Sequence, residues 1–345
     1  MPSRTRRMFV PAVATLGLLG SACGTQELPQ NALDPQGPVA RQLDNLWDPV
    51  FLVAVVVFFL VQGLVLYCLF KFRAKSDEDA PVQVHGNAKL ELGWTVAPAM
   101  ILAFIGFFTV ATVFDINRRA EGEEVVQVNV IGHQWWWEYD YTDEGIKTAN
   151  ELHIPAGEPV QIALNAEDVM HNFWPPKLAG KVYAIPGRTN YMQIEADVPG
   201  EYAGQCAEYC GLSHANMRLK VIAHERADYD RWVADQKRPA ATPAASDANA
   251  VAGAGLFGGQ CTRCHVIEGV QGGEIEQPAP NLTHLASRTC FAGCMFEMND
   301  SNLRRWLRNP PAEKPMNPDN NQGMPNLGLT EEQITQLIAY LNTLK

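Results

Sequence analysis

The hydrophobic residues of this chain first form two long uninterrupted runs. Residues 50–70 and 93–114 are almost wholly apolar. At about 1.5 Å per residue, each run is long enough to cross the roughly 30 Å hydrocarbon core of a bilayer as a helix. The loop between them carries Lys71, Arg73, Lys75 and Lys89, and loops rich in Lys and Arg remain in the cytoplasm. We therefore predict a transmembrane hairpin over 50–119, with both of its ends outside the cytoplasm.

A two-residue alternation of apolar and polar positions follows from about residue 120. It occurs in residues 126–130 and 160–164, and again in 191–194 and 218–222. Because successive side chains of a strand point to opposite faces, these runs predict half-buried strands joined by Pro-Gly turns. Residues 120–235 are therefore predicted to form an all-β antiparallel sandwich or small barrel.

The last third of the chain contains a spacer and a helical pattern. Residues 236–252 are rich in Ala and Pro, which predicts a flexible linker. Residues 330–333 form a capping box, and apolar side chains recur after it at helical spacing, namely Ile334, Leu337, Ile338 and Leu341. We predict that residues 253–345 form a small all-α domain.

The N-terminal segment resembles an export signal. Three arginines precede an apolar run over 8–19, and small residues lead to Cys23. Residues 1–22 are thus a predicted signal peptide, which leaves 23–49 as an extracytoplasmic segment. The small residues are similar to a lipoprotein processing box, which would make Cys23 the lipidated N-terminus. Ordinary signal cleavage and a retained apolar segment are the alternatives.

Charge changes this picture only in the β domain. The chain of 345 residues has a net charge of -11, which excludes nucleic-acid binding by charge. Residues 120–235 hold 8 Lys and Arg against 19 Asp and Glu, so this domain alone accounts for 8 − 19 = −11. Such an acidic surface attracts basic partners, although acidity also serves solubility.

The densest chemistry lies within residues 206–217. Two thiols, Cys206 and Cys210, are followed by His214 and Met217, and His171 is the candidate for a second histidine. These soft and borderline ligands select copper or zinc. Tetrahedral zinc sites usually use paired C-x2-C knuckles, a single blue copper leaves one thiol unused, and a disulfide is the third alternative.

This ligand set resembles the binuclear copper centre, CuA, of subunit II of haem–copper cytochrome c oxidases. The resemblance implies a cupredoxin-like barrel for residues 120–235 and adds the backbone carbonyl of Glu208 as the sixth ligand. It also implies a magnesium ion at the interface with subunit I, bound in part by the Glu208 side chain.

A second cofactor motif follows the linker. The sequence Cys261-Thr262-Arg263-Cys264-His265 is the haem attachment signature, in which both thiols bind the haem and the histidine binds its iron. Met324, followed by Pro325, resembles the second axial ligand of class I cytochromes c, and Met316 is the alternative.

Two further cysteines, Cys290 and Cys294, have no role in either cofactor motif. A disulfide is the simplest interpretation for cysteines outside the cell. Their i,i+4 spacing would strain that disulfide if they lay on a regular helix.

The resemblance assigns roles to two more residues. In the family, the first tryptophan of the G-H-Q-W-x-W run marks the electron entry point, which is Trp135 here. An E-x-x-W pattern lies at the entrance of a proton channel, which is Glu91 here, although a solvated carboxylate is the alternative. On a strand, Trp136 would face away from Trp135 and Trp137, with one face buried and the remainder at the membrane interface.

These features together predict the electron-entry subunit of a haem-c-fused, aa-type, proton-pumping oxidase in the cell membrane. All eight histidines lie outside the two apolar runs, so we place no catalytic residue here and assign oxygen reduction to subunit I. The expected partners are subunits I and III and a cytochrome c or cytochrome bc complex as donor. A copper-containing nitric oxide reductase subunit and a non-enzymatic, membrane-tethered copper carrier are the alternatives.

Overall fold

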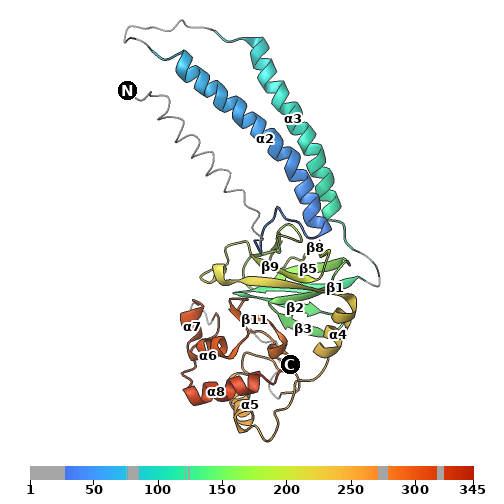
Figure 1. The fold of residues 1–345 in the computed structure, drawn as a ribbon, viewed down its shortest axis with the longest axis vertical. Coiled ribbons are helices and arrows are strands. Elements are labelled where there is room, and N and C mark those ends of the chain that lie inside the picture. Colours follow the sequence, from blue (N-terminus) through green and yellow to red (C-terminus); the bar gives the residue numbers. More distant parts are fainter. Residues whose placement is uncertain are drawn as a thin grey trace, which may run out of the picture.

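The computed structural model describes residues 28–74, 76, 85–120, 122, 125–270, 279–316 and 322–345. Within them the chain forms a helical hairpin, a β-sheet domain and a small helical domain (Figure 1). The hairpin and the small helical domain lie at opposite ends of the β-sheet domain (Figure 1). The predicted signal peptide and Cys23 lie outside the described residues, so both stay predictions.

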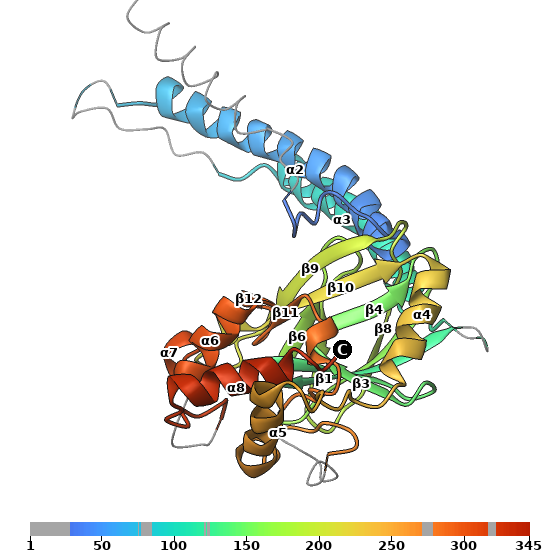
Figure 2. The same ribbon diagram turned by 60° about the horizontal axis from the view of Figure 1, so that its bottom comes forward.

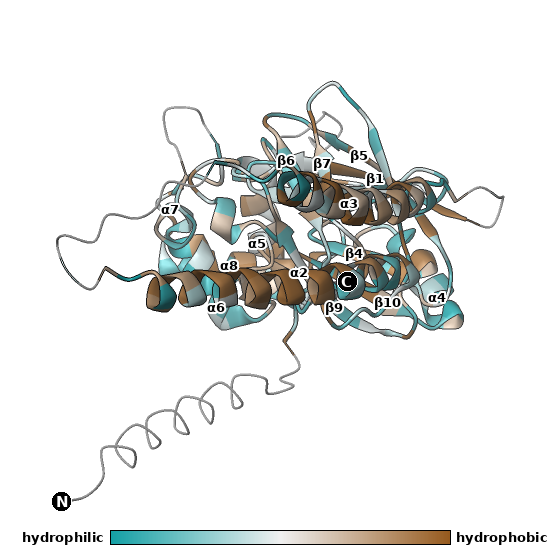
Figure 3. Cartoon of the chain, turned by 90° about the horizontal axis from the view of Figure 1, so that it is seen from above, coloured by the Kyte–Doolittle hydropathy of each residue, from teal (hydrophilic) through white to brown (hydrophobic). Residues whose placement is uncertain are grey.

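The hairpin consists of α2 (Pro38–Lys71) and α3 (Ala88–Ile116). Both helices are long and apolar enough to cross a membrane, and they contain the predicted spans (Figure 3). Helix α2 begins well before the apolar run because its first turns pack on the β-sheet domain. There Val39 and Ala40 are buried, and Arg41 pairs with Asp197.

Within the described residues, the β-sheet domain contains ten strands in two five-stranded sheets. One sheet has the order β3-β2-β1-β5-β8 and the other has the order β4-β10-β9-β6-β7. The strands are β1 (Val126–His133), β2 (Trp136–Tyr141), β3 (Ile146–Ala149), β4 (Glu151–Pro155), β5 (Val160–Ala166), β6 (His171–Trp174), β7 (Val182–Ala184), β8 (Asn190–Ile194), β9 (Gly200–Cys206) and β10 (Arg218–His224).

The four alternating runs of the sequence lie in β1, β5, β8 and β10, as predicted. The sheets are not wholly antiparallel, however, because β1 pairs in parallel with β5 and β10 pairs in parallel with β4. Local alternation identifies a strand but does not encode the direction of its partner. The core between the sheets includes Trp137, Tyr139 and Phe173, all fully buried.

The segment after the sheets differs from the prediction at both ends. Helix α4 (Arg226–Gln236) packs on the β-sheet domain and contains Gln236, the first residue of the predicted linker. Helix α5 (Ala248–Gln260) begins before the predicted domain boundary at 253. Asp247 caps α5 by accepting a hydrogen bond from the Ala250 amide at 2.9 Å. The linker therefore spans 237–247, and the prediction was too long because alanine also favours helix.

The small domain is built on α5 and α8 (Glu331–Leu341), which cross closely (Figure 2). A Cβ on Gly253 would lie 2.0 Å from the Gln336 carbonyl oxygen, so only glycine permits this approach. The predicted capping box begins α8, and its apolar face is buried. The domain is not entirely helical. Besides α6 (Asp300–Arg308), α7 (Pro310–Glu313) and a 3-10 turn (Leu285–Ser287), it contains the short strands β11 (Cys290–Phe291) and β12 (Phe296–Glu297).

Candidate copper centre and haem cavity

The predicted copper ligands converge at the end of the β-sheet domain that faces the small helical domain. Cys206 ends β9, His171 begins β6, and Met217 immediately precedes β10. His214 begins the 3-10 turn His214–Asn216. His171 therefore lies at a strand end and not on a loop, and the fold brings it to the 206–217 segment because β6 pairs with β9.

The two thiols form the middle of this group. The Sγ atoms of Cys206 and Cys210 lie 3.7 Å apart. The Nδ1 atom of His171 lies 3.9 Å from the Cys206 sulfur, and the Nδ1 atom of His214 lies 3.5 Å from the Cys210 sulfur. The Met217 sulfur lies 3.8 Å from the Cys210 sulfur, and the Glu208 carbonyl oxygen lies 3.3 Å from the Cys206 sulfur.

This donor set fits a pair of copper ions better than one zinc ion. One histidine lies beside each sulfur, and a thioether and a carbonyl supply further donors. A structural zinc site closes with four ligands and leaves no place for six. Both cysteines, Met217 and His171 are buried, whereas His214 and Glu208 are partly exposed.

Asp168, which no sequence pattern indicated, holds the His171 ring. Its Oδ1 atom lies 2.8 Å from Nε2 of His171, and its other carboxylate oxygen accepts a hydrogen bond from the Gln134 amide at 2.7 Å. Placing the proton on Nε2 leaves the Nδ1 lone pair facing the thiols. Burial lowers the pKa of His171, but the hydrogen bonds to Asp168 and Cys206 outweigh it and raise the pKa.

The electrostatics of the thiols favour metal binding. The hydrogen bond with Cys210 lowers the pKa of Cys206, which favours its thiolate form. The same hydrogen bond and burial raise the pKa of Cys210. Thiolates are the form that binds metal ions.

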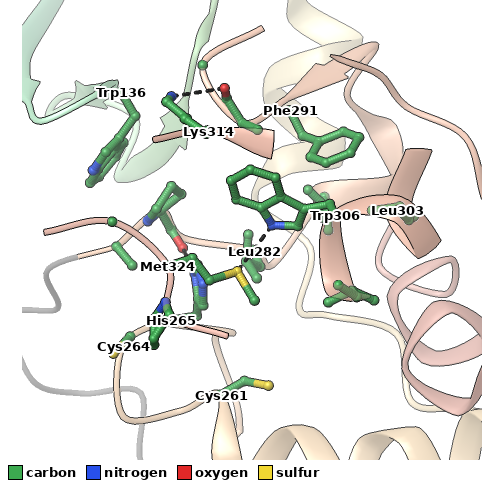
Figure 4. A pocket seen from close by; sticks show the side chains of 18 of the residues that line it. Trp136, Cys261, Cys264, His265, Leu282, Phe291, Leu303, Trp306, Lys314 and Met324 are labelled. Carbon is green, nitrogen blue, oxygen red and sulfur yellow. Dashed lines mark hydrogen bonds between the residues drawn. The ribbon is translucent and has the colours of Figure 1, made fainter. Parts of the chain in front are cut away.

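The haem motif lines a cavity of about 470 Å³ between the small helical domain and the end of the β-sheet domain (Figure 4). Cys261, Cys264 and His265 form one part of its wall, and most of the remaining wall is apolar. The Nδ1 atom of His265 donates a hydrogen bond to the Pro280 carbonyl at 2.9 Å, which leaves Nε2 as the ring nitrogen available to iron. The two thiols, the histidine tautomer and the apolar wall all fit a covalently bound haem.

Met324 lines the same cavity and accepts a hydrogen bond from Trp306. The Trp306 Nε1 atom lies 3.1 Å from the Met324 sulfur (Figure 4). Met316 also lines the cavity, but it packs against the core of the β-sheet domain. This geometry favours Met324 as the axial ligand. Trp306 was missed because an isolated tryptophan in a helix has no distinctive spacing.

Cys290 and Cys294 are joined by a disulfide. The strained alternative placed both cysteines on a regular helix, but they do not lie on one. Cys290 begins β11, and residues 292–294, which connect the two short strands, all have positive φ.

Trp135 lies between the copper ligands and the haem cavity. Strand β1 ends at His133 and β2 begins at Trp136, so Gln134 and Trp135 form the turn. The Trp135 indole donates a hydrogen bond to the Cys210 carbonyl at 2.9 Å. The turn interrupts the strand that was expected over 135–137. The expected difference in orientation is nevertheless present, because Trp135 and Trp137 pack in the core between the sheets and Trp136 stacks on the His133 ring outside that core. All three tryptophans are buried.

The membrane-interface alternative for these tryptophans is also wrong. Trp135 and Trp136 line the haem cavity, at the end of the β-sheet domain opposite the hairpin (Figure 1).

Glu91 lies in the exposed first turn of α3, and Glu208 is partly exposed. Their proposed roles in proton entry and magnesium binding stay predictions.

Comparison with known proteins agrees with this division. The family model "Cytochrome C oxidase subunit II, transmembrane domain" matches residues 27–112, the model of the periplasmic domain of the same subunit matches 144–224, and the cytochrome c model matches 250–345. Cytochrome c oxidase subunit 2 of Alkalihalophilus pseudofirmus is 38% identical over 99% of this chain and 98% of its own length. The corresponding protein of Bacillus sp. PS3 is 36% identical over 80% of each chain.

A crystal structure of the periplasmic domain of subunit II of cytochrome oxidase from Bradyrhizobium japonicum is 27% identical. It covers 35% of this chain and 97% of its own length, with a TM-score of 0.33. The family domains imply copper and haem c binding and a membrane protein with two spans. The chain belongs to the cytochrome c oxidase subunit II family, with a cupredoxin-like copper domain followed by a cytochrome c domain.

Proposed function

We propose that this chain receives electrons from an external cytochrome c or cytochrome bc complex on its own haem c and passes them through CuA to subunit I. The observation that supports this proposal is the position of Trp135, which contacts a copper ligand and also lines the haem cavity. The bound cofactors supply one-electron transfer, and the residues hold those cofactors in place.

Each group of residues has a separate task in this proposal. Cys261 and Cys264 bind the haem covalently, while His265 and Met324 hold its iron. The six donors His171, Cys206, Glu208, Cys210, His214 and Met217 hold the two copper ions. Burial of His171, Cys206, Cys210 and Met217 limits the access of water to the copper site. The hydrogen bond that His171 donates to Asp168 and the one that Met324 accepts from Trp306 fix a ligand in each site. No proton transfer is required of these residues.

The assembly follows from the exposed apolar side chains of the hairpin, which suit a membrane and the helices of subunits I and III. The Lys and Arg residues of the loop between the helices support an orientation with the copper and cytochrome c domains on the extracytoplasmic side. In this orientation Glu91 lies at the cytoplasmic end of α3, where a proton channel would begin. Glu208 would bind magnesium at the interface with subunit I, and a lipid on Cys23 would add a second anchor.

The burial of the copper ligands disfavours a copper carrier. A carrier must exchange its metal with a partner, yet both thiols are buried and the cytochrome c domain covers this end of the copper domain. Oxygen consumption by the purified complex, with no consumption of nitric oxide, would separate the oxidase from a nitric oxide reductase.

The decisive variant is Cys210→Ser in the purified complex. We expect loss of the near-infrared copper band and fewer than two copper ions per chain, while the haem c is still reduced by the donor. Reoxidation of that haem by oxygen should then stop. Cys68→Ser, in the exposed part of α2, is the matched control and should behave as wild type. Two copper ions with an unchanged spectrum would refute the bridging role, and unchanged haem reoxidation would refute the route.

A further inference from the structure

The cytochrome c domain is joined to the copper domain by more than its linker. Two buried charged side chains reach across the interface in opposite directions, Glu151 from the copper domain and Lys314 from the cytochrome c domain. We propose that Glu151 and Lys314 act as reciprocal positioning residues that hold the haem cavity in one fixed position over the copper ligands. This inference rests on the proposed function for its purpose, but its geometry is independent of it.

Glu151 binds the backbone of the cytochrome c domain. It lies on β4 and is fully buried. Its Oε1 atom accepts three hydrogen bonds of 2.7 Å, from the amide and hydroxyl of Thr289 and from the amide of Cys290. Burial raises the pKa of Glu151, but the nearby His153 ring and the hydrogen bonds from Thr289 and Cys290 outweigh it and lower the pKa. A buried carboxylate that loses such partners is strongly destabilising, so the copper domain alone does not suit this side chain.

Lys314 makes the reverse connection. It follows α7 and is only 6% exposed. Its Nζ atom donates hydrogen bonds to the Trp135 carbonyl at 2.6 Å and to the Ala292 carbonyl at 3.0 Å. The side chain also lines the haem cavity (Figure 4). Because the Trp135 indole bonds to the Cys210 carbonyl, two hydrogen bonds connect the cavity wall to the peptide of a copper ligand.

The disulfide-linked segment 289–294 lies between the two charges. The Gly293 carbonyl accepts a hydrogen bond from the Arg218 amide of β10 at 3.0 Å. A Cβ on Gly293 would lie 2.6 Å from the Lys314 Nζ and 2.7 Å from the Asn216 carbonyl oxygen. The two backbones therefore meet at a distance that only glycine permits. Such complementarity indicates a specific docked position.

Buried charges suit this purpose better than apolar contacts. An apolar patch tolerates sliding, whereas a shift of a few ångströms would leave both charges buried without partners. The pair therefore excludes alternative positions more than it strengthens the chosen one. A fixed position matters here because electrons must cross from one domain to the other.

The test uses Glu151→Gln and Lys314→Met in the full chain within the purified complex. Hydrogen–deuterium exchange at the Arg218 and Cys290 amides, both donors across the interface, reports docking without any electron transfer. We expect each variant to exchange these amides about tenfold faster, since hydrogen bonds to charged groups are strong. Cleavage of the 237–247 linker by protease should also accelerate. Glu158→Gln and Lys345→Met, both at more exposed sites, are the matched controls.

Wild-type exchange in both variants would overturn the proposal. Haem and copper spectra check that each domain is folded. If a buried variant alters either spectrum, Thr289→Val decides, because the side-chain hydroxyl of this exposed residue donates one of the three hydrogen bonds to Glu151. In this variant the Arg218 and Cys290 amides should exchange about threefold faster, and unchanged exchange would again refute the proposal. If the variants exchange faster but the wild type shows no electron transfer from haem to copper, the docking is supported and the proposed function is refuted.

Discussion

The carboxylate behind His171 allows a quantitative test of the copper centre. In Asp168→Asn, the side chain keeps its shape and can still accept a hydrogen bond from His171, but it loses its charge. Hydrogen bonds to charged groups contribute about 1.5–3 kcal/mol and neutral ones about 1 kcal/mol. The Asp168 side chain is 31% exposed, which favours the lower end of this difference. A loss of about 0.7 kcal/mol corresponds to an affinity for copper that is about threefold weaker.

Competition between the protein and a copper chelator, followed at the near-infrared band, would measure this affinity. Asp143→Asn, at an exposed turn remote from the ligands, is the matched control and should leave it unchanged. Asp168→Ala should have the larger effect, about a hundredfold, because the imidazole then loses its orientation as well. Copper affinity within twofold of wild type in both Asp168 variants would show that the hydrogen bond does not tune the site.

Two further predictions concern the copper domain. Gly132→Ala should weaken copper binding at least tenfold, because the added Cβ would lie 2.7 Å from Cδ2 of His171 and displace the ring. Metal counts would test this. Gly200→Ala is the control and should match wild type, because the atom nearest to its added Cβ is 3.8 Å away. Burial and the nearby His153 lower the pKa of His224 from 6.5 to about 4. At pH values between these two pKa values the unfolded chain binds more protons than the folded chain. The free energy of unfolding should therefore decrease as pH falls from about 6.5 to about 4. Urea unfolding should show a flatter pH dependence in His224→Gln, and an unchanged dependence would refute the assignment.

The features predicted correctly from the sequence are those encoded in short segments. The copper loop, the haem motif, the apolar spans and four strands each depend on spacing within about twenty residues. Asp168 and Trp306 act on a ligand through one hydrogen bond, and a single residue of either type carries no pattern. Glu151 and Lys314 meet partners on the other domain, so no local periodicity indicates their role. The turn at Trp135 was missed because Trp136 and Trp137 follow it directly, and this aromatic run suggested a continuous strand.

The linker at 237–247 has a consequence for the strength of the docked interface. A flexible chain of this length keeps its ends within roughly 20 Å of each other. The copper domain and the cytochrome c domain at the two ends of the linker then meet at an effective concentration of about 1 mM. An interface with a dissociation constant of about 50 µM between separate domains would therefore be about 95% closed when tethered. Buried charges that select a position at the expense of affinity are tolerable on such a tether, and the same interface between two separate proteins would be mostly dissociated at micromolar concentrations.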